Sequence, residues 1–264
     1  MNYYKNKTVL ITGAFGGFGK HFINQLVNSG ANVILSDVAE APLSRILENK
    51  AHEKQVMAII PTDLSSAEGC QHLYDEYQKV SSAPDMIIHN AGIGAFSEYV
   101  DLPMEKMEAI MNINLMSVLR LNTLFIPAMV KRKSGHLLYL SSVAGFVATP
   151  FGAPYSSSKF GLRAFAMALH GENKKYGIKT SIIYPFWSKT AIIKSQVYGN
   201  PDVRVMPGFF ASEPDYVVRK ALQGASKGKL HICPGLFSKL MWLAVRFMPV
   251  IAEQRFMKDD LIKG

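Results

Sequence analysis

The order of the apolar segments constrains the fold of this chain more than any other feature. Seven short runs rich in aliphatic and β-branched residues recur along it, separated by helix-length segments. The runs lie at 8–12, 32–36, 56–61, 85–90, 136–141, 179–185 and 229–234. Near-continuous apolar character is typical of strands that helices cover on both faces. The pattern predicts an α/β fold with a doubly wound, parallel, seven-stranded sheet of the Rossmann type.

The size and composition of the chain favour one domain over residues 1–264. It is 48% hydrophobic and 19% charged, which is enough apolar material for one large core. Cys70 and Cys233 are the two cysteines, and their wide separation predicts neither a disulfide framework nor a metal site. No signal-peptide pattern precedes the first run, so we expect a cytoplasmic protein.

The net charge of +9 is compatible with nucleic acid, an anionic membrane or an anionic ligand as partner. Basic residues do not gather in a block interleaved with aromatic residues. We therefore expect no nucleic-acid partner.

The first apolar run leads into a glycine-rich turn with the spacing G-x-x-x-G-x-G, which opens the first helix-length segment. Glycine permits positive φ and a close approach of backbone N–H groups to a pyrophosphate, and the helix N-terminus adds partial positive charge. A glycine turn without a ligand is the alternative, but the strand–turn–helix context favours dinucleotide binding. The candidate residues of this stretch are Thr12, Gly13, Gly17, Phe18 and Gly19.

Asp37 ends the second apolar run, about 20 residues after the glycine turn. A carboxylate there accepts hydrogen bonds from both hydroxyls of an adenosine ribose and repels a 2′-phosphate. A helix-capping role is the alternative. No lysine or arginine stands in the turn or just after Asp37 to receive that phosphate, so the sequence predicts NAD(H) rather than NADP(H).

Several further motifs occur in one order along the chain. They are TGAFGGFG (12–19), TDL (62–64), HNAG (89–92), NINL (112–115), YLSSVAG (139–145), YSSSK (155–159) and PFWSKT (185–190). In this order the chain resembles the short-chain dehydrogenase/reductase family from about residue 6 to residue 235. The resemblance implies a catalytic set of Asn114, Ser142, Tyr155 and Lys159. It also implies cofactor contacts from Asp63, Leu64, Asn90, Ala91, Gly92, Tyr155, Lys159, Pro185 and Thr190.

The spacing of Tyr155 and Lys159 has its own physical reading. An isolated pair one helical turn apart is more often a solvated helix face. A tyrosine has an ordinary pKa near 10, and lowering it by about 3 units takes roughly 4 kcal/mol of phenolate stabilisation. Lys159 and an oxidised nicotinamide would supply that charge. Ser142 would hold the substrate oxygen, and the amide of Asn114 would hold a water that relays protons from Lys159.

The sequence departs from the family pattern at Phe186, where the family has glycine after proline. Either the Phe186 ring turns outward or it narrows the cleft. His89 and His136 adjoin strands, and core or edge positions suit them better than a role as general base.

Residues 190–212 are expected to form a lid over an apolar substrate, and residues 235–264 an amphipathic extension. Within 236–251 an apolar stripe recurs at helical spacing, with Lys239, Trp242 and Arg246 on another face. Its members are Leu236, Leu240, Leu243, Phe247 and Ile251. The stripe could pack on a partner subunit or over the pocket, lie in a membrane interface as a peripheral contact, or belong to the core.

These features predict an oxidoreductase that transfers hydride between NAD(H) and an apolar secondary alcohol or ketone, steroid-, retinoid- or acyl-like. We expect a homodimer or homotetramer. A non-catalytic dinucleotide-binding regulator on the same fold is the alternative, and a membrane-bound enzyme whose tail delivers a lipid substrate is a third reading.

Overall fold

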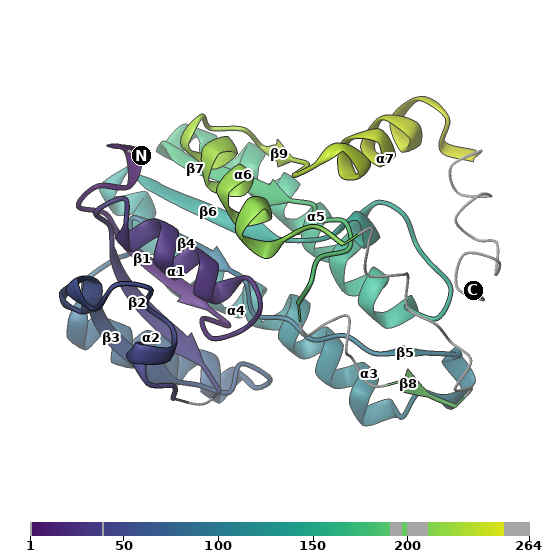
Figure 1. Ribbon diagram of the computed structural model, residues 1–264, viewed down its shortest axis with the longest axis horizontal. Helices are drawn as coiled ribbons and strands as arrows, with labels where there is room; N and C mark the ends of the chain where they lie inside the picture. The colour runs from purple at the N-terminus through teal and green to yellow at the C-terminus, as the bar shows by residue number, and fades with distance from the viewer. Residues whose placement is uncertain (1, 39, 191–196, 200–210, 251–264) are drawn as a thin grey trace.

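Seven parallel strands form the sheet, in the order β3-β2-β1-β4-β6-β7-β9 (Figure 1). Their bounds are β1 (Thr8–Thr12), β2 (Asn32–Asp37), β3 (Val56–Pro61), β4 (Met86–His89), β6 (Gly135–Leu140), β7 (Ile178–Ile183) and β9 (His231–Ile232). The structure is a computed structural model that describes residues 2–38, 40–190, 197–199 and 211–250. All seven strands lie within a residue or two of the runs predicted from the sequence, and the fold prediction is confirmed.

Helices cover both faces of the sheet, and each face has its own core. On one face lie α1 (Gly19–Val27) and α6 (Pro214–Ser226), which share a core with β1 and β2. On the other face lie α2 (Ala67–Val80), α4 (Ser117–Arg132) and α5 (Ala153–Asn173). Burial on two faces explains why the strands are apolar at nearly every position.

The topology opens a crevice at the carboxyl ends of the strands. β1 pairs with β2 on one side and with β4 on the other, so the chain changes winding direction between β1 and β4. Open α/β sheets bind ligands at this switch point, outside the carboxyl ends of the strands. The glycine turn follows β1, and the HNAG stretch follows β4, so the fold brings both to the crevice.

One long helical stretch runs from α3 (Met104–Met111) through a π-helical turn (Asn112–Met116) into α4. By length and composition, Met104–Arg132 is the one helix in the described residues that could cross a membrane. Here Val118, Leu121 and Phe125 of this helix are buried in the core. One face of the stretch therefore packs into the core of the fold.

Some elements were not predicted from the sequence. A second, two-stranded sheet joins β5 (Phe96–Ser97) to β8 (Val197–Tyr198) beside α3 (Figure 1). Strands of two residues carry no periodicity, so only the fold brings them together.

The C-terminal helix α7 (Leu236–Phe247) follows β9 and lies at the end of the molecule (Figure 1). It is shorter than the predicted 236–251. Residues 191–196 and 200–210 of the predicted lid, and residues 251–264 of the predicted extension, lie outside the described residues.

Candidate active site

The glycine turn after β1 is built by close approach of backbones. Gly13 has φ +61°, and a Cβ there would lie 2.7 Å from the Cα of Ala91. Gly17 has no positive φ, but a Cβ there would lie 2.6 Å from the Cβ of Thr190. A larger residue at either position would push apart the segments that enclose the crevice. Close backbone and side-chain contacts thus explain why glycine stands at these two positions, whether or not a ligand binds.

The first helix begins next to this turn and leaves an anion site open. Phe18 is the N-cap of α1, and its side chain makes no capping hydrogen bond. The first backbone N–H groups of a helix need partners and carry partial positive charge, which suits a pyrophosphate. The local geometry therefore fits the phosphates of a dinucleotide.

Asp37 stands at the carboxyl end of β2 and ties the glycine turn to it. Its Oδ2 accepts a hydrogen bond of 2.8 Å from the backbone N–H of Phe15, and its Oδ1 accepts one of 2.8 Å from Val38. The carboxylate is thus held beside the turn, and its negative charge faces any group bound there. The role predicted for Asp37 at the ribose stays a prediction.

Thr12 and Asn90 lock the ends of β1 and β4 together. The Thr12 hydroxyl accepts from the backbone N–H groups of Asn90 and Ala91, both at 3.2 Å. The Asn90 amide nitrogen donates to the carbonyls of Thr12 and Gly13, at 3.0 and 2.7 Å. The pair of residues shapes the crevice rather than filling it.

Asp63 and Leu64 follow β3, the neighbour of β2, and have different surroundings. Asp63 is exposed, and its Oδ1 accepts from the backbone N–H of Ser65 at 2.9 Å. Leu64 is buried in the core that the sheet shares with α2, α4 and α5. Asp63 and Asp37 therefore share one edge of the sheet, where the resemblance expects an adenosine.

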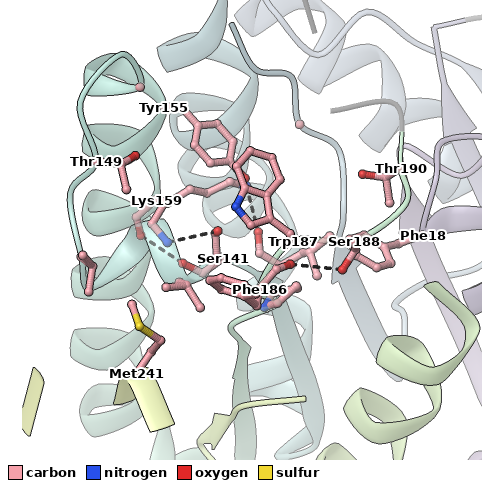
Figure 2. Close-up of a pocket in the computed structure, with 18 of the residues that line it drawn as sticks. Phe18, Ser141, Thr149, Tyr155, Lys159, Phe186, Trp187, Ser188, Thr190 and Met241 are labelled. Carbon is pink, nitrogen blue, oxygen red and sulfur yellow. Dashed lines mark hydrogen bonds between the residues drawn. The ribbon is translucent and has the colours of Figure 1, made fainter. Parts of the chain in front are cut away.

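A cavity of about 140 Å³ opens beyond the carboxyl ends of β4 and β6 (Figure 2). Of the residues predicted for the site, those that line it are Phe18, Asn90, Gly92, Ser142, Tyr155, Lys159, Pro185 and Thr190. The structure thus brings Ser142, Tyr155 and Lys159 together from β6 and α5. Asn114 and the residues around the adenosine edge lie outside this cavity.

Lys159 is almost completely buried, at 3% exposed. Its Nζ donates to the backbone carbonyl of Leu140 at 2.9 Å and lies 5.6 Å from the centre of the Tyr155 ring. Burial lowers the pKa of Lys159 from 10.5 to about 8. The ammonium is therefore charged at neutral pH but titrates close to it.

Burial raises the pKa of Tyr155 to about 12, and a hydrogen bond from Ser142 acts in the opposite direction. The predicted lowering of this pKa includes the charge of an oxidised nicotinamide, whereas the raised pKa is that of the polypeptide alone. The pKa is raised because desolvation of the phenolate outweighs what its protein neighbours supply. The predicted lowering of the Tyr155 pKa rests on Lys159 together with an oxidised nicotinamide.

Asn114 lies in the π-helical turn and is fully buried. Its Oδ1 accepts from the backbone N–H of Ile93 at 2.9 Å, while its Nδ2 donates to the Ile93 carbonyl at 3.0 Å and to the Ser158 hydroxyl at 3.1 Å. The water predicted at this amide stays a prediction. The amide fixes the backbone after β4 and the helix that carries Lys159.

The sequence left open whether the Phe186 ring turns outward or narrows the cleft, and the structure places this ring. Phe186 has no positive φ, and its ring stacks on Phe237 of α7 with the centres 5.8 Å apart. The next ring, that of Trp187, packs 5.8 Å from Phe96 of β5. Both residues still line the cavity (Figure 2), so they make its wall apolar without a strained backbone.

The structure also shows site residues that sequence reasoning missed. Phe96 and Met241 line the cavity, and the Leu140 carbonyl accepts from Lys159. The sequence could have identified Leu140 as a site residue, because it directly precedes the serines of the YLSSVAG motif. Phe96 and Met241 gave no local signal, since only long-range packing brings them to the cavity.

His89 and His136 are core residues, as expected. His89 stacks on the ring of Tyr139 at 5.1 Å, and burial lowers its pKa to about 4. His136 bonds Ser181 and Tyr3, both at 3.0 Å, and burial lowers its pKa to about 3. Both rings are neutral at pH 7 and lie outside the cavity.

A doubly wound sheet, a glycine turn at its switch point and a Tyr-Lys pair in an apolar cavity define a protein of the dinucleotide-binding oxidoreductase class. The family model for short chain dehydrogenases matches residues 7–199. The chain therefore belongs to the short-chain dehydrogenase family.

Among its relatives, human epidermal retinol dehydrogenase 2 is 31% identical over 248 residues, which span 92% of this chain and 78% of that protein. An uncharacterised oxidoreductase of Staphylococcus aureus strain MRSA252 is 27% identical over 73% of this chain and 82% of its own length.

Solved structures share the fold at lower identity. A short-chain dehydrogenase from Streptomyces avermitilis superposes with a TM-score of 0.82 at 21% identity, over 95% of each chain. A Burkholderia phymatum enzyme in complex with NAD gives a TM-score of 0.80 at 21% identity, over 97% of each chain. A Sphingobium yanoikuyae enzyme in complex with NADPH gives 0.78 at 22% identity, over 91% of this chain and 92% of that chain.

Proposed function

We propose that this protein transfers hydride between NAD(H) and an apolar secondary alcohol or ketone, steroid-, retinoid- or acyl-like. The observation that carries the proposal is the placement of Ser142, Tyr155 and Lys159 in one largely apolar cavity next to the glycine turn. The apolar wall favours a hydrophobic substrate, and the likeness to a retinol dehydrogenase supports that choice.

The residues fit a bound dinucleotide. The open N-terminus of α1 suits its phosphates, and the Asp37 carboxylate suits the two hydroxyls of an unmodified ribose. Relatives of this fold were solved with NAD and with NADPH, so the fold alone does not select between them. Our choice of NAD(H) rests on Asp37, because its charge repels a 2′-phosphate.

A bound oxidised nicotinamide would supply the acceptor for the hydride of the carbinol carbon of an alcohol. Ser142 holds the substrate oxygen by a hydrogen bond, and Tyr155 takes the hydroxyl proton as that oxygen becomes a carbonyl. In the reverse direction the Tyr155 phenol returns the proton. The buried Lys159 ammonium stabilises the phenolate, and Asn114 keeps the helix that carries Lys159 in register.

The proposal is tested with a panel of apolar alcohols and ketones and both cofactors, followed by the absorbance of the reduced nicotinamide. We expect turnover with NAD(H), and a fall in kcat of about 10²–10⁴-fold in Tyr155→Phe with little change in cofactor binding. Tyr99→Phe, at an exposed tyrosine, is the matched control. Cofactor binding without turnover of any compound would favour the alternative, a regulator. Light scattering tests the expected homodimer or homotetramer.

A further inference from the structure

α7 presents a stripe of large apolar side chains to solvent. Leu236, Leu240, Leu243 and Phe247 are 68%, 52%, 48% and 72% exposed. They are three or four residues apart, so they share one face of the helix. An exposed apolar patch of this kind usually marks an interaction site.

The opposite face of α7 holds the helix firmly on the fold, so the stripe is not a frayed end. The Ser238 hydroxyl donates to the carbonyl of Tyr184 at 2.5 Å. The Trp242 ring packs against Phe146 at 5.3 Å and His231 at 4.7 Å, and the Arg163 guanidinium lies 5.1 Å from its centre. The helix is thus fixed with its apolar stripe turned outward.

One flank of α7 borders a basic groove of about 430 Å³ between α6, β9 and α7. Four lysines line it, namely Lys220, Lys227, Lys229 and Lys239. None of the described residues that line it is acidic. Lys239 belongs to α7 itself, so the lysine groove and the apolar stripe are adjacent parts of one surface.

We propose that this surface docks the protein on an anionic phospholipid bilayer. The apolar stripe would enter the boundary between headgroups and acyl chains, and the lysines would face the lipid phosphates. A second copy of the chain is a poorer occupant, because a symmetric contact centred on the stripe would bring two lysine grooves close together. The sequence of α7 agrees, since Lys239 and Arg246 are its charged residues.

The other flank of α7 reaches the catalytic cavity. Met241 lines that cavity and extends toward it from α7 (Figure 2), while Phe237 stacks on Phe186, which also lines it. Docking would therefore bring the cavity close to the bilayer. An apolar substrate dissolved in the bilayer would then reach the cavity along α7. This route rests on the proposed function.

The test is co-sedimentation of the full chain with phosphatidylcholine vesicles, with and without phosphatidylglycerol, and without cofactor or substrate. We expect binding that requires phosphatidylglycerol and weakens with salt. The double variant Leu240→Asp/Leu243→Asp should bind at least about a hundredfold more weakly. The triple variant Lys220→Gln/Lys227→Gln/Lys229→Gln should also bind these vesicles about a hundredfold more weakly.

Matched controls use exposed residues elsewhere in the fold. Tyr99→Asp/Val100→Asp and Lys50→Gln/Lys54→Gln/Lys131→Gln should bind vesicles as the wild type does. Wild-type binding to neither vesicle, or unchanged binding in the α7 and groove variants, would overturn the proposal. Light scattering adds a second readout: a larger wild-type particle that Leu240→Asp/Leu243→Asp reduces, without vesicle binding, would assign the stripe to a second copy. Because no turnover is measured, failure here leaves the oxidoreductase proposal untouched.

Discussion

The Nζ atom of Lys159 donates a hydrogen bond to the backbone carbonyl of Leu140, 2.9 Å away. This contact joins α5 to the carboxyl end of β6 and holds a cation in a place that water hardly reaches. Burial of that cation costs folding free energy, and the lowered pKa of Lys159 measures the cost. The protein thus keeps an unfavourable group where the proposed chemistry needs it.

Lys159→Met should therefore stabilise the fold at neutral pH. The pKa of Lys159 is about 8 in the folded protein against 10.5 as the ordinary value, so the penalty is fully present below pH 8 and disappears as pH rises toward 10.5. We expect the free energy of unfolding at pH 7 to rise by about 1–3 kcal/mol, since Met removes the charge but leaves the Leu140 carbonyl without this donor.

Urea unfolding of both proteins between pH 7 and pH 10 measures the difference. The increase in the free energy of unfolding should become smaller from pH 7 to pH 10. The Lys159→Met variant should have no turnover at any pH. A variant that is less stable than wild type at pH 7, or a gain that does not change with pH, would contradict the account of Lys159.

The pKa of Tyr155 should depend on the cofactor. It is raised to about 12 by burial in the polypeptide, so the phenol alone is a poor base at neutral pH. The positive nicotinamide of NAD⁺ should lower it by several units, whereas NADH, with a neutral ring, should not. Ultraviolet difference titration of wild type against Tyr155→Phe, with each cofactor in turn, measures this. An equal pKa in both complexes would show that Lys159 and Ser142 set it instead.

Asp37→Asn should reduce the preference for NADH over NADPH. The amide keeps an oxygen that accepts from the backbone of Phe15 but removes the charge that repels a 2′-phosphate. We expect about a tenfold gain in relative NADPH affinity, equivalent to about 1.4 kcal/mol. Fluorescence titration with both reduced cofactors measures it, and Glu172→Gln, at an exposed residue of α5, is the control. Tighter binding of NADPH than NADH by the wild type would refute the role given to Asp37.

Gly17→Ala should destabilise the protein because the new Cβ would lie 2.6 Å from the Cβ of Thr190. We expect a loss of about 1–3 kcal/mol in the free energy of unfolding, typical of overpacking. Thr190→Gly in the same chain should restore most of it, and the double-mutant cycle isolates the contact. Gly171→Ala is the control: it has open space in α5 and should stabilise by about 0.5–1 kcal/mol. Additive effects of the Gly17 and Thr190 changes would show that the two segments do not touch.

The sequence by itself determined the strands, the order of the motifs and the candidate Tyr-Lys pair. These features are local patterns that can be identified along the chain: apolar runs, a glycine turn and an i,i+4 spacing. Tyr155 and Lys159 are one turn apart in any helix that contains them. The sequence could not separate their catalytic role from a solvated helix face without the other motifs.

Only the tertiary structure decided what those residues touch. The Phe186 ring stacks on Phe237 of α7, and the Asn114 amide bonds Ile93 and Ser158. The tertiary structure also decided the desolvation that raises the pKa of Tyr155 and the exposure of the α7 stripe. Burial, partner choice and electrostatic balance depend on groups far apart in the sequence, and no periodicity along one segment records which of them will meet.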